Sequence, residues 1–359
     1  MKKLGFGFMR LPVLDPNDAS KVDFEQLCSM VDRFMEKGFT YFDTAYVYHK
    51  EQSEIFLRKA LVERYPRDSF KIATKLPMPK VNSAEDNEKL FNEELEKCGV
   101  EYFDYYLLHA MNSERFEKAK KYGSFEFLKK MKAEGKIKHI GFSFHDDVKL
   151  LEEMLTLWPE TEFVQLQINY IDWENPSIQA KECYDLCTKL GKPVIVMEPI
   201  KGGSLVDIPQ EAEKLFKDYA PDASVASWAV RYAASLDNVM MVLSGMSNME
   251  QMLDNIRYMK DFQPLSDKEM ELIGKVRTLY QAQNRIPCTG CRYCTDGCPA
   301  GIDIPALFAC LNDKREGKET NYDTFEVKAD ACVECGQCEG ECPQHLQIRD
   351  LLKEVAVAF

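Results

Sequence analysis

The residues best suited to chemistry are cysteines that form two runs of identical spacing near the carboxyl end of the chain. Each run has the pattern Cys-x-x-Cys-x-x-Cys-x-x-x-Cys-Pro, and two such copies are very improbable by chance. Cysteine thiolates can hold zinc or iron–sulfur clusters, and paired cysteines can form disulfides. The runs comprise Cys288, Cys291, Cys294 and Cys298, followed by Cys332, Cys335, Cys338 and Cys342.

Three explanations of the cysteine runs differ in how much of the pattern they use. A disulfide framework suits short secreted chains, whereas this chain has 359 residues. A zinc site would leave the third cysteine and the closing proline of each run unused. The full pattern resembles that of bacterial two-cluster ferredoxins, in which the fourth cysteine of each run crosses to the other cluster. It predicts one [4Fe–4S] cluster held by Cys288, Cys291, Cys294 and Cys342, and a second held by Cys332, Cys335, Cys338 and Cys298.

The composition limits the partners of this chain. It carries 46 Lys and Arg against 59 Asp and Glu, a formal net charge of −13, which argues against nucleic acid and an anionic membrane surface as partners. The amino end lacks the apolar segment of a secretory signal, and no apolar run approaches the roughly 18 residues of a membrane helix. We therefore expect a cytoplasmic protein. The clusters predicted above separately suggest a redox partner protein at the cysteine-rich part.

Before the cysteine runs, eight short apolar runs alternate with longer amphipathic stretches. Apolar runs suit strands buried on both faces of a parallel sheet, and eight strands alternating with helices predict a (β/α)8 barrel. An open doubly wound sheet is the alternative, but no Gly-x-Gly-x-x-Gly follows the first run. The expected strands are Leu4–Met9, Phe39–Phe42, Phe70–Thr74, Tyr102–Leu108, Ile137–Phe142, Phe163–Ile168, Val194–Met197 and Val239–Leu243. The expected helices are Val22–Lys37, Ser53–Arg64, Ala84–Lys97, Ala119–Glu134, Val148–Leu157, Ile178–Leu190, Ser224–Leu236 and Met249–Met259.

The pattern changes after the last of these helices, and we divide the chain into three parts. Residues 1–262 form the expected barrel. Residues 263–283 form a linker helix, which begins with a capping box at Ser266 and Glu269. Residues 284–359 form a small, mostly helical, ferredoxin-like domain, with helical patterns at Ile304–Leu311 and Ile348–Val357. The expected architecture is therefore an α/β barrel followed by a two-cluster domain.

Three neighbouring strands of the expected barrel end in side chains that share a chemical use. Asp43 and Tyr48 follow the second strand, while Lys75 follows the third and His109 the fourth. Barrel active sites lie at these carboxyl ends. An ammonium beside Tyr48 would lower its pKa from about 10, and Asp43 would supply the counter-charge that a buried lysine needs. Each residue alone has an ordinary structural explanation, but together they predict a site that protonates a carbonyl oxygen as hydride reaches its carbon.

These residues lie in motifs that resemble the aldo-keto reductase family over roughly residues 1–260, and the whole chain resembles the branch with a carboxyl-terminal ferredoxin-type domain. The motifs are Phe42-Asp43-Thr44-Ala45-x-x-Tyr48, Ala73-Thr74-Lys75 and Leu107-Leu108-His109. The resemblance implies that NAD(P)H binds across the barrel mouth, that Tyr48 is the general acid, and that the substrate is a small carbonyl compound or alcohol. It also implies a cofactor site made of Gly7, Met9, Ser143, Gln165, Met197, Glu198, Ile200, Gly202, Gly203, Ser244, Gly245, Ser247, Gln251 and Asn255.

Some positions depart from the family pattern. The family's usual Ser-Asn after the fifth strand is Ser143-Phe144 here, and Met197 replaces the aromatic residue that stacks on the nicotinamide. Gly245 and Gln251 replace cations that many members direct at the 2′-phosphate, so the choice between NADP and NAD stays open. Met197 forms a softer wall, and a flavin could use the room.

The two parts of the chain are expected to transfer different numbers of electrons per step, because nicotinamide delivers a two-electron hydride and each cluster passes one electron. Three arrangements remain open. In the first, the barrel reduces a carbonyl while the clusters serve structure, sensing or docking. In the second, a flavin links the barrel to the clusters or to a partner. In the third, the barrel belongs to a non-catalytic electron-transfer or regulatory subunit. A purely structural barrel has no need of the tyrosine, lysine, aspartate and histidine set, which argues against the third arrangement, and of the three we favour the first.

Overall fold

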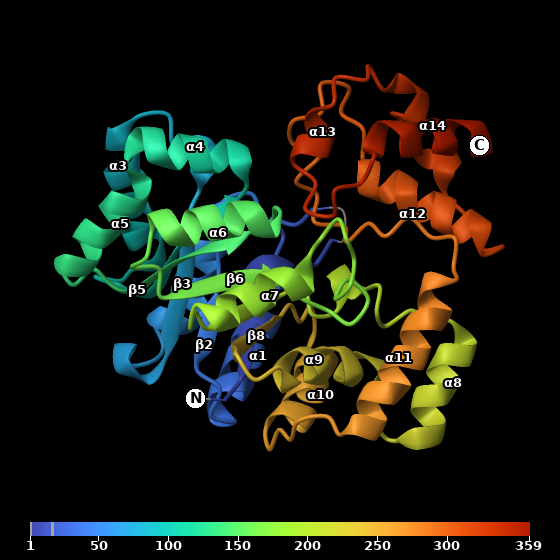
Figure 1. Cartoon of the computed structure of the whole chain (residues 1–359), viewed down its shortest axis with the longest axis horizontal. Coiled ribbons are helices and arrows are strands. Elements are labelled where there is room, and N and C mark those ends of the chain that lie inside the picture. Colours follow the sequence, from blue (N-terminus) through green and yellow to red (C-terminus); the bar gives the residue numbers. More distant parts are fainter. Residues whose placement is uncertain (1, 16–17) are drawn as a thin grey trace.

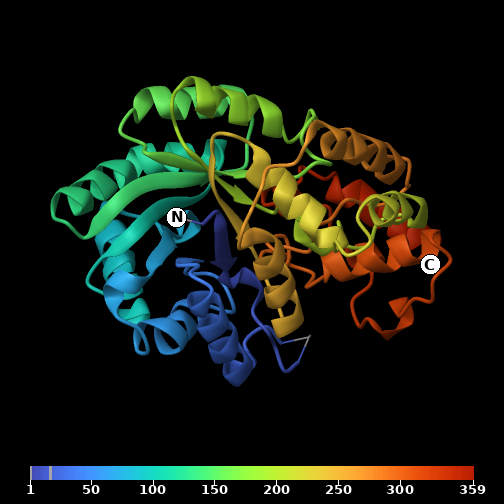
Figure 2. The same ribbon diagram turned by 90° about the horizontal axis from the view of Figure 1, so that it is seen from below.

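A closed barrel of eight parallel strands forms the amino-terminal part of the chain, as the apolar runs predict (Figures 1 and 2). The computed structural model describes residues 2–15 and 18–359. The strands pair in chain order, and β1 closes the barrel against β8. They are β1 Leu4–Gly7, β2 Tyr41–Asp43, β3 Lys71–Leu76, β4 Phe103–Met111, β5 Ile137–Phe144, β6 Phe163–Gln167, β7 Val194–Met197 and β8 Val239–Ser244. Each predicted strand is confirmed, with small differences at the ends.

Most of the expected helices also form, and they surround the barrel. They are α1 Phe24–Glu36, α2 Ser53–Leu57, α3 Ala84–Cys98, α6 Val148–Leu157, α7 Ala180–Lys189, α9 Val225–Ser235 and α10 Met249–Met259. A π-helical turn at Arg58–Val62 continues α2. Apolar residues at three- and four-residue spacing face the barrel in these helices, so burial of that stripe stabilises them.

Two helical regions differ from the expectation. The single helix predicted at Ala119–Glu134 is wrong: the segment holds α4 Ser113–Tyr122 and α5 Ser124–Ala133. Gly123 separates them with a φ of 63°, a left-handed conformation that glycine adopts at low cost and that ends a helix. The additional helix α8 Gln210–Tyr219 has no counterpart among the predicted elements.

The interior of the barrel is packed with side chains. They come from six strands and include five aliphatic or sulfur-containing residues and three aromatic rings: Tyr41, Ala73, Tyr105, Leu107, Phe163, Ile195, Met241 and Leu243. A filled barrel has no central channel, so chemistry must take place at the strand ends and in the loops beyond them.

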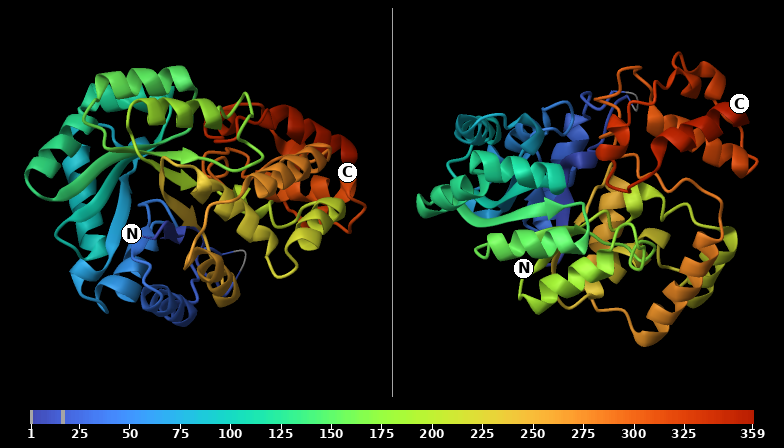
Figure 3. Two further views of the ribbon diagram at one scale, coloured as in Figure 1. Left: turned by 60° about the horizontal axis from the view of Figure 1, so that its bottom comes forward. Right: turned by 45° about the horizontal axis from the view of Figure 1, so that its top comes forward.

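The carboxyl-terminal part forms a separate lobe beside the barrel mouth (Figures 1 and 3). It is joined through α11 Asp267–Gln281, which starts at the predicted Ser266–Glu269 capping box and packs along α8. The lobe contains α12 Ile304–Arg315, α13 Gln337–Gly340 and α14 Ile348–Ala358. Cysteines make up part of its small core, so the metal chemistry of the cysteines bears directly on its packing. No helix among the described residues is long and apolar enough to cross a membrane.

Candidate active site

The four predicted catalytic residues lie together at the carboxyl end of the barrel. Strand β2 ends at Asp43, and the adjacent β3 carries Lys75, whose Nζ donates to Asp43 Oδ1 and to the Thr44 carbonyl oxygen, each at 2.7 Å. Tyr48 lies on the loop after β2, with its ring centre 5.2 Å from Lys75 Nζ. The ring centre of His109 on β4 is 5.9 Å from that of Tyr48, in an edge-on contact.

Burial dominates the electrostatics of this group. It raises the pKa of Tyr48 above its ordinary value, and the Asp43 carboxylate adds to the rise. The net shift of the Tyr48 pKa is therefore opposite to the lowering that we expected from Lys75, because burial is its largest cause and Asp43, which pairs with the ammonium, adds to the rise. Burial also lowers the pKa of His109, helped by the charges of Lys75 and Arg115. Tyr48 is thus protonated and His109 neutral at physiological pH.

The strand that carries His109 is irregular just beyond it. The pairing of β4 with β5 shifts register between Leu108 and Met111, and Ala110 has a left-handed φ of 53°. The Ala110 N–H donates to Ser143 Oγ at 2.7 Å. Ser143, which we expect in the cofactor site, is buried, and its hydroxyl oxygen holds the backbone beside His109.

A cavity of about 320 Å³ opens next to Tyr48 and Asp43. Its walls contain every residue of the predicted cofactor set except Ser143: Gly7, Met9, Gln165, Met197, Glu198, Ile200, Gly202, Gly203, Ser244, Gly245, Ser247, Gln251 and Asn255. The cavity thus brings together residues that are far apart along the chain.

The walls of this cavity offer polar atoms to a ligand. Gln165 Oε1, Ser244 Oγ and Asn255 Oδ1 are buried and have no hydrogen-bond partner among the described residues. An unpaired buried polar atom is costly, and a ligand that bonds to it removes that cost. The donors and acceptors fit a nucleotide with an amide and hydroxyl groups. Arg10 also lines the cavity and adds a positive charge that suits phosphate.

The eight cysteines of the two runs gather in two groups within the carboxyl-terminal lobe. One cavity is lined by Cys288, Cys291, Cys294 and Cys342, and another by Cys298, Cys332, Cys335 and Cys338. In each group one cysteine comes from the opposite run, Cys342 in the first and Cys298 in the second, as the crossed arrangement requires. Among the described residues, no three His, Cys, Asp or Glu side chains are arranged to hold a single metal ion.

Backbone N–H groups surround the sulfur atoms of the first group. The Gly290 N–H donates to Cys288 Sγ at 3.4 Å. Burial raises the pKa of the Cys342 thiol, and N–H groups of residues 344–346 oppose this rise. Hydrogen bonds to sulfur stabilise the thiolates that ligate iron and tune a cluster's reduction potential. The donor set therefore fits an iron–sulfur cluster.

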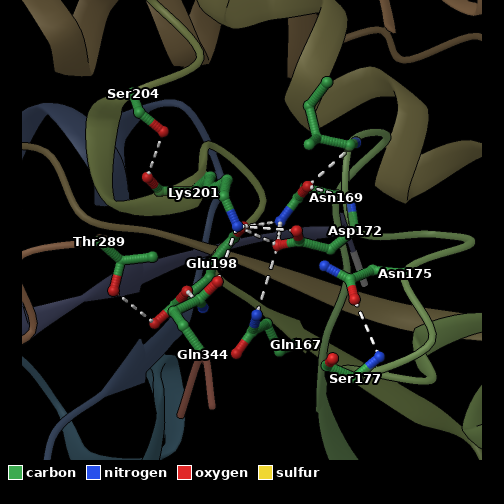
Figure 4. Close-up of polar contacts among 11 residues, drawn as sticks. Gln167, Asn169, Asp172, Asn175, Ser177, Glu198, Lys201, Ser204, Thr289 and Gln344 are labelled. Atoms are coloured by element: carbon green, nitrogen blue, oxygen red, sulfur yellow. Dashed lines mark hydrogen bonds and ion pairs between the residues drawn. The ribbon is translucent and has the colours of Figure 1, made fainter. Parts of the chain in front are cut away.

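A buried polar network joins the barrel to this first cysteine group (Figure 4). Lys201 Nζ donates to both oxygens of Asp172 and to Gln344 Oε1, each at 2.7 Å. Gln344 Nε2 donates to Glu198 Oε2 at 3.1 Å, and the Thr289 hydroxyl lies 3.5 Å from Glu198 Oε1. Burial raises the pKa of Glu198 to about 7, and the charge of Lys201 opposes the rise. The network positions the lobe over the barrel mouth.

Sequence reasoning missed most of this interface. Thr289 follows Cys288, and Gln344 follows the Cys342-Pro343 pair, but nothing in their spacing indicates a partner in the barrel. Cys291 and Tyr293 were likewise not expected to line the barrel cavity, as they do. The sequence offered one signal of this interface, the Gly202–Gly203 pair. In the structure, a Cβ on Gly202 would lie 2.1 Å from the Thr289 carbonyl oxygen, so only glycine fits there. Such a glycine permits close backbone approach.

Comparison with solved structures supports the barrel architecture. An aldo-keto reductase from Klebsiella pneumoniae, solved with NADPH, has a TM-score of 0.60 and 19% identity and covers 79% of this chain and 92% of its own. An aldo-keto reductase from Bacillus halodurans has a TM-score of 0.61 and 24% identity and covers 76% of this chain and 91% of its own. At these identities the likeness shows the fold.

Comparison of sequences identifies the family. An uncharacterised oxidoreductase of Schizosaccharomyces pombe is 26% identical over 72% of this chain and 81% of its own length. A probable aldo-keto reductase of Glycine max is 29% identical over 56% of this chain and 57% of its own length. The family model described as "Aldo/keto reductase family" matches residues 3–278, and that described as "4Fe-4S dicluster domain" matches residues 287–346. The chain therefore belongs to the aldo/keto reductase family and carries a ferredoxin-type iron–sulfur domain at its carboxyl end.

Proposed function

We propose that the barrel of this iron–sulfur oxidoreductase transfers hydride between NAD(P)H and a small carbonyl compound or alcohol. The observation that carries the proposal is the buried group in which Lys75 and Asp43 pair beside the ring of Tyr48, with His109 at its edge. In the reductive direction, hydride reaches the carbonyl carbon and Tyr48 donates its proton to the carbonyl oxygen. The products are the alcohol and the oxidised nicotinamide.

The residues of the group have distinct roles in this proposal. Tyr48 is protonated before the reaction, and Lys75 stabilises the phenolate that remains after proton transfer. Asp43 keeps the ammonium in place and balances its charge. Neutral His109 donates a hydrogen bond to the carbonyl oxygen and so orients the substrate. A proton then returns to Tyr48 from solvent.

The cavity supplies the proposed cofactor site. Gln165 would hold the nicotinamide amide through the side-chain oxygen that now lacks a partner. Ser244 and Asn255 would contact the adenosine half, and the Gly202–Gly203 loop would border the pyrophosphate. The NADPH-bound Klebsiella enzyme shares the barrel fold, which supports a nucleotide in this position. Because Gly245 and Gln251 carry no charge, the proposal includes NAD as well as NADP.

Replacement of the proposed acid tests this function. We expect Tyr48→Phe to lower carbonyl reduction by about 10²- to 10⁴-fold, because it removes the proton donor and leaves the ring in place. The rate is measured as loss of NAD(P)H absorbance with a panel of aldehydes, and cofactor binding by nucleotide fluorescence. Tyr46→Phe is the matched control, since the Tyr46 hydroxyl bonds to Glu93 at 2.9 Å. Equal rates in the two variants would rule out Tyr48 as the acid.

A second candidate function is favoured by one observation. Cys291, a proposed cluster ligand, lines the same cavity as Gln165 and Met197. A flavin in that cavity would therefore lie beside the first cluster and could convert hydride into single electrons. Cys335 of the second group is exposed, which would allow a redox partner protein to approach the second cluster.

Anaerobic spectroscopy separates the two candidates. The purified protein should contain about eight irons in two four-iron clusters. Under the first proposal, NAD(P)H alone leaves the cluster absorbance unchanged, because hydride does not divide into single electrons at a cluster. Rapid bleaching by NAD(P)H when flavin is present would instead favour the second. Zinc in place of iron would contradict both assignments of the cysteines.

A further inference from the structure

Tyr293 belongs to the iron–sulfur lobe, yet its side chain reaches the candidate active site. It lies between Cys291 and Cys294 of the first cysteine group and lines the barrel cavity. Its ring centre is 6.4 Å from that of His109, in an edge-on contact. A hydrogen bond joins the Tyr293 and Tyr48 side chains. His109 therefore contacts two phenol rings, one from each part of the chain.

The loop that carries Tyr293 is held in place on several sides. Cys291 and Cys294 would both be tied to one cluster. Arg10 Nη2 donates to the Thr289 carbonyl oxygen at 2.8 Å. The same carbonyl lies so close to Gly202 that no side chain fits between them. These contacts argue that Tyr293 is a fixed wall of the site.

The hydrogen bond to Tyr48 has a consequence for substrates. The Tyr293 hydroxyl donates to the Tyr48 oxygen, so Tyr48 stays free to give its own proton to a carbonyl oxygen placed beside His109. The Tyr293 oxygen is left as an acceptor in a half-buried site, and a substrate that covers it without donating to it leaves it unpaired, which is unfavourable. A substrate with a hydroxyl next to the carbonyl can donate to this oxygen. A substrate with only a hydrocarbon there cannot.

We propose that Tyr293 determines specificity at the carbonyl site, favouring small compounds with a hydroxyl adjacent to the carbonyl, such as 2-hydroxyaldehydes. This inference rests on the proposed function, since it places the reacting carbonyl against Tyr48. It gives the iron–sulfur lobe a role in substrate selection, because the cysteines on either side of Tyr293 set its position. The small size follows from the ring, which occupies space beside His109.

Two isosteric pairs of compounds test this role. Glycolaldehyde and propanal differ by a hydroxyl in place of a methyl group, as do the amides glycolamide and propionamide. We expect the native holoprotein to prefer glycolaldehyde in kcat/KM by about tenfold, the effect of one unpaired buried hydroxyl. Calorimetry with NADP⁺ bound should show a similar preference for glycolamide, and this readout does not depend on turnover. Tyr293→Phe should bring both ratios close to one.

Tyr322→Phe is the matched control within the same lobe. Its ring stacks on Phe359 with centroids 4.1 Å apart, away from the barrel. It should retain both preferences, and all three proteins should contain equal iron. Equal binding of the two amides to the native protein, including no measurable binding of either, would overturn the inference. Survival of the preference in Tyr293→Phe would do the same.

The outcome distinguishes this inference from the function on which it rests. If Tyr48→Phe abolishes aldehyde reduction while Tyr293→Phe leaves the amide ratio unchanged, the function stands and the inference fails. If Tyr48→Phe has no effect on reduction, the proposed function fails. The amide ratio then reports separately whether Tyr293 recognises the adjacent hydroxyl.

Discussion

Two buried lysine–aspartate pairs at the barrel mouth have almost the same geometry and different surroundings. Lys75 and Asp43 lie 2.7 Å apart with side chains no more than 5% exposed. Lys201 and Asp172 also lie 2.7 Å apart, each 1% exposed. The first pair faces the ring of Tyr48, whereas the second donates to Gln344 of the iron–sulfur lobe. The neighbours of a buried pair, rather than the pair itself, therefore indicate what it does.

The comparison also shows how each pair is stabilised. Burying two charges is costly, and the mutual attraction offsets the cost only when further hydrogen bonds complete the site. Lys75 also donates a hydrogen bond to the Thr44 carbonyl oxygen. Asp172 also accepts a hydrogen bond from the side-chain amide of Asn169 at 2.8 Å. Removing one partner from such a pair typically costs about 3–5 kcal/mol, because the other charge stays buried alone. The two lysines can therefore be compared directly by mutation.

Lys75→Met should give the largest effect on catalysis. We expect carbonyl reduction to fall by about 10²- to 10⁴-fold, since the phenolate of Tyr48 loses its stabilising charge. We also expect the free energy of unfolding to fall by about 3–5 kcal/mol, because Asp43 becomes unpaired. Iron content should be unchanged. Stopped-flow rates and urea unfolding measure the two effects, and reduction within threefold of the native rate would contradict the role of Lys75.

Lys201→Met should lower the stability of the protein strongly and the rate of carbonyl reduction only slightly. It leaves Asp172 unpaired and removes the contact with Gln344, so we expect a similar loss of stability of about 3–5 kcal/mol. The segment between α11 and the first cysteine should become more susceptible to limited proteolysis. Carbonyl reduction should fall less than tenfold, because the pair does not face Tyr48. Lys214→Met is the control, since its pair with Asp218 is exposed and is worth about 0–1 kcal/mol.

If Lys201→Met lowers the reduction rate as much as Lys75→Met does, the separation of the two pairs into a chemical and a docking role is wrong. Rates and proteolysis measured on the same preparations decide the matter.

Glu54 extends the comparison to a buried carboxylate without a bonded cation. Its substitution should change the free energy of unfolding less than that of either lysine. It accepts a hydrogen bond from Thr74 at 2.7 Å, and no ion pair joins it to a cation in the described part of the chain. Burial raises its pKa to about 7, against an ordinary value of 4.5. A raised pKa means that folding favours the protonated form, so this contribution to stability is complete below pH 4.5 and is lost as the pH rises through 7.

Glu54→Gln should remove that pH dependence. We expect the variant to gain about 1–3 kcal/mol over the native protein at pH 8 and to gain nothing below pH 4.5. Urea unfolding at several pH values measures the difference. Parallel stability curves for the two proteins across this range would show that Glu54 does not titrate as described.

Much of the fold could be predicted because its signals are local. Each strand of the barrel is a short apolar run, since both of its faces are buried. The capping box at Ser266 and the glycines that end helices act within a few residues. Gly123 was overlooked as a helix end because apolar residues continue on both sides of it. Helix α8 was missed although Ala212, Leu215, Phe216 and Tyr219 recur at helical spacing, because it is additional to the eight helices that the barrel pattern requires.

The sequence by itself determined the two cysteine runs, the eight strands and the residues at their carboxyl ends, because spacing along the chain encodes all three. Only the tertiary structure decided that Tyr293 meets Tyr48 and that Lys201 meets Gln344. Lys201 and Gln344 stand 143 positions apart, and contact at such separation depends on how two packed parts dock. Docking buries polar groups whose partners cannot be chosen until both surfaces exist. The cysteine runs are thus a local pattern, whereas their place beside the candidate active site is a property of the folded chain.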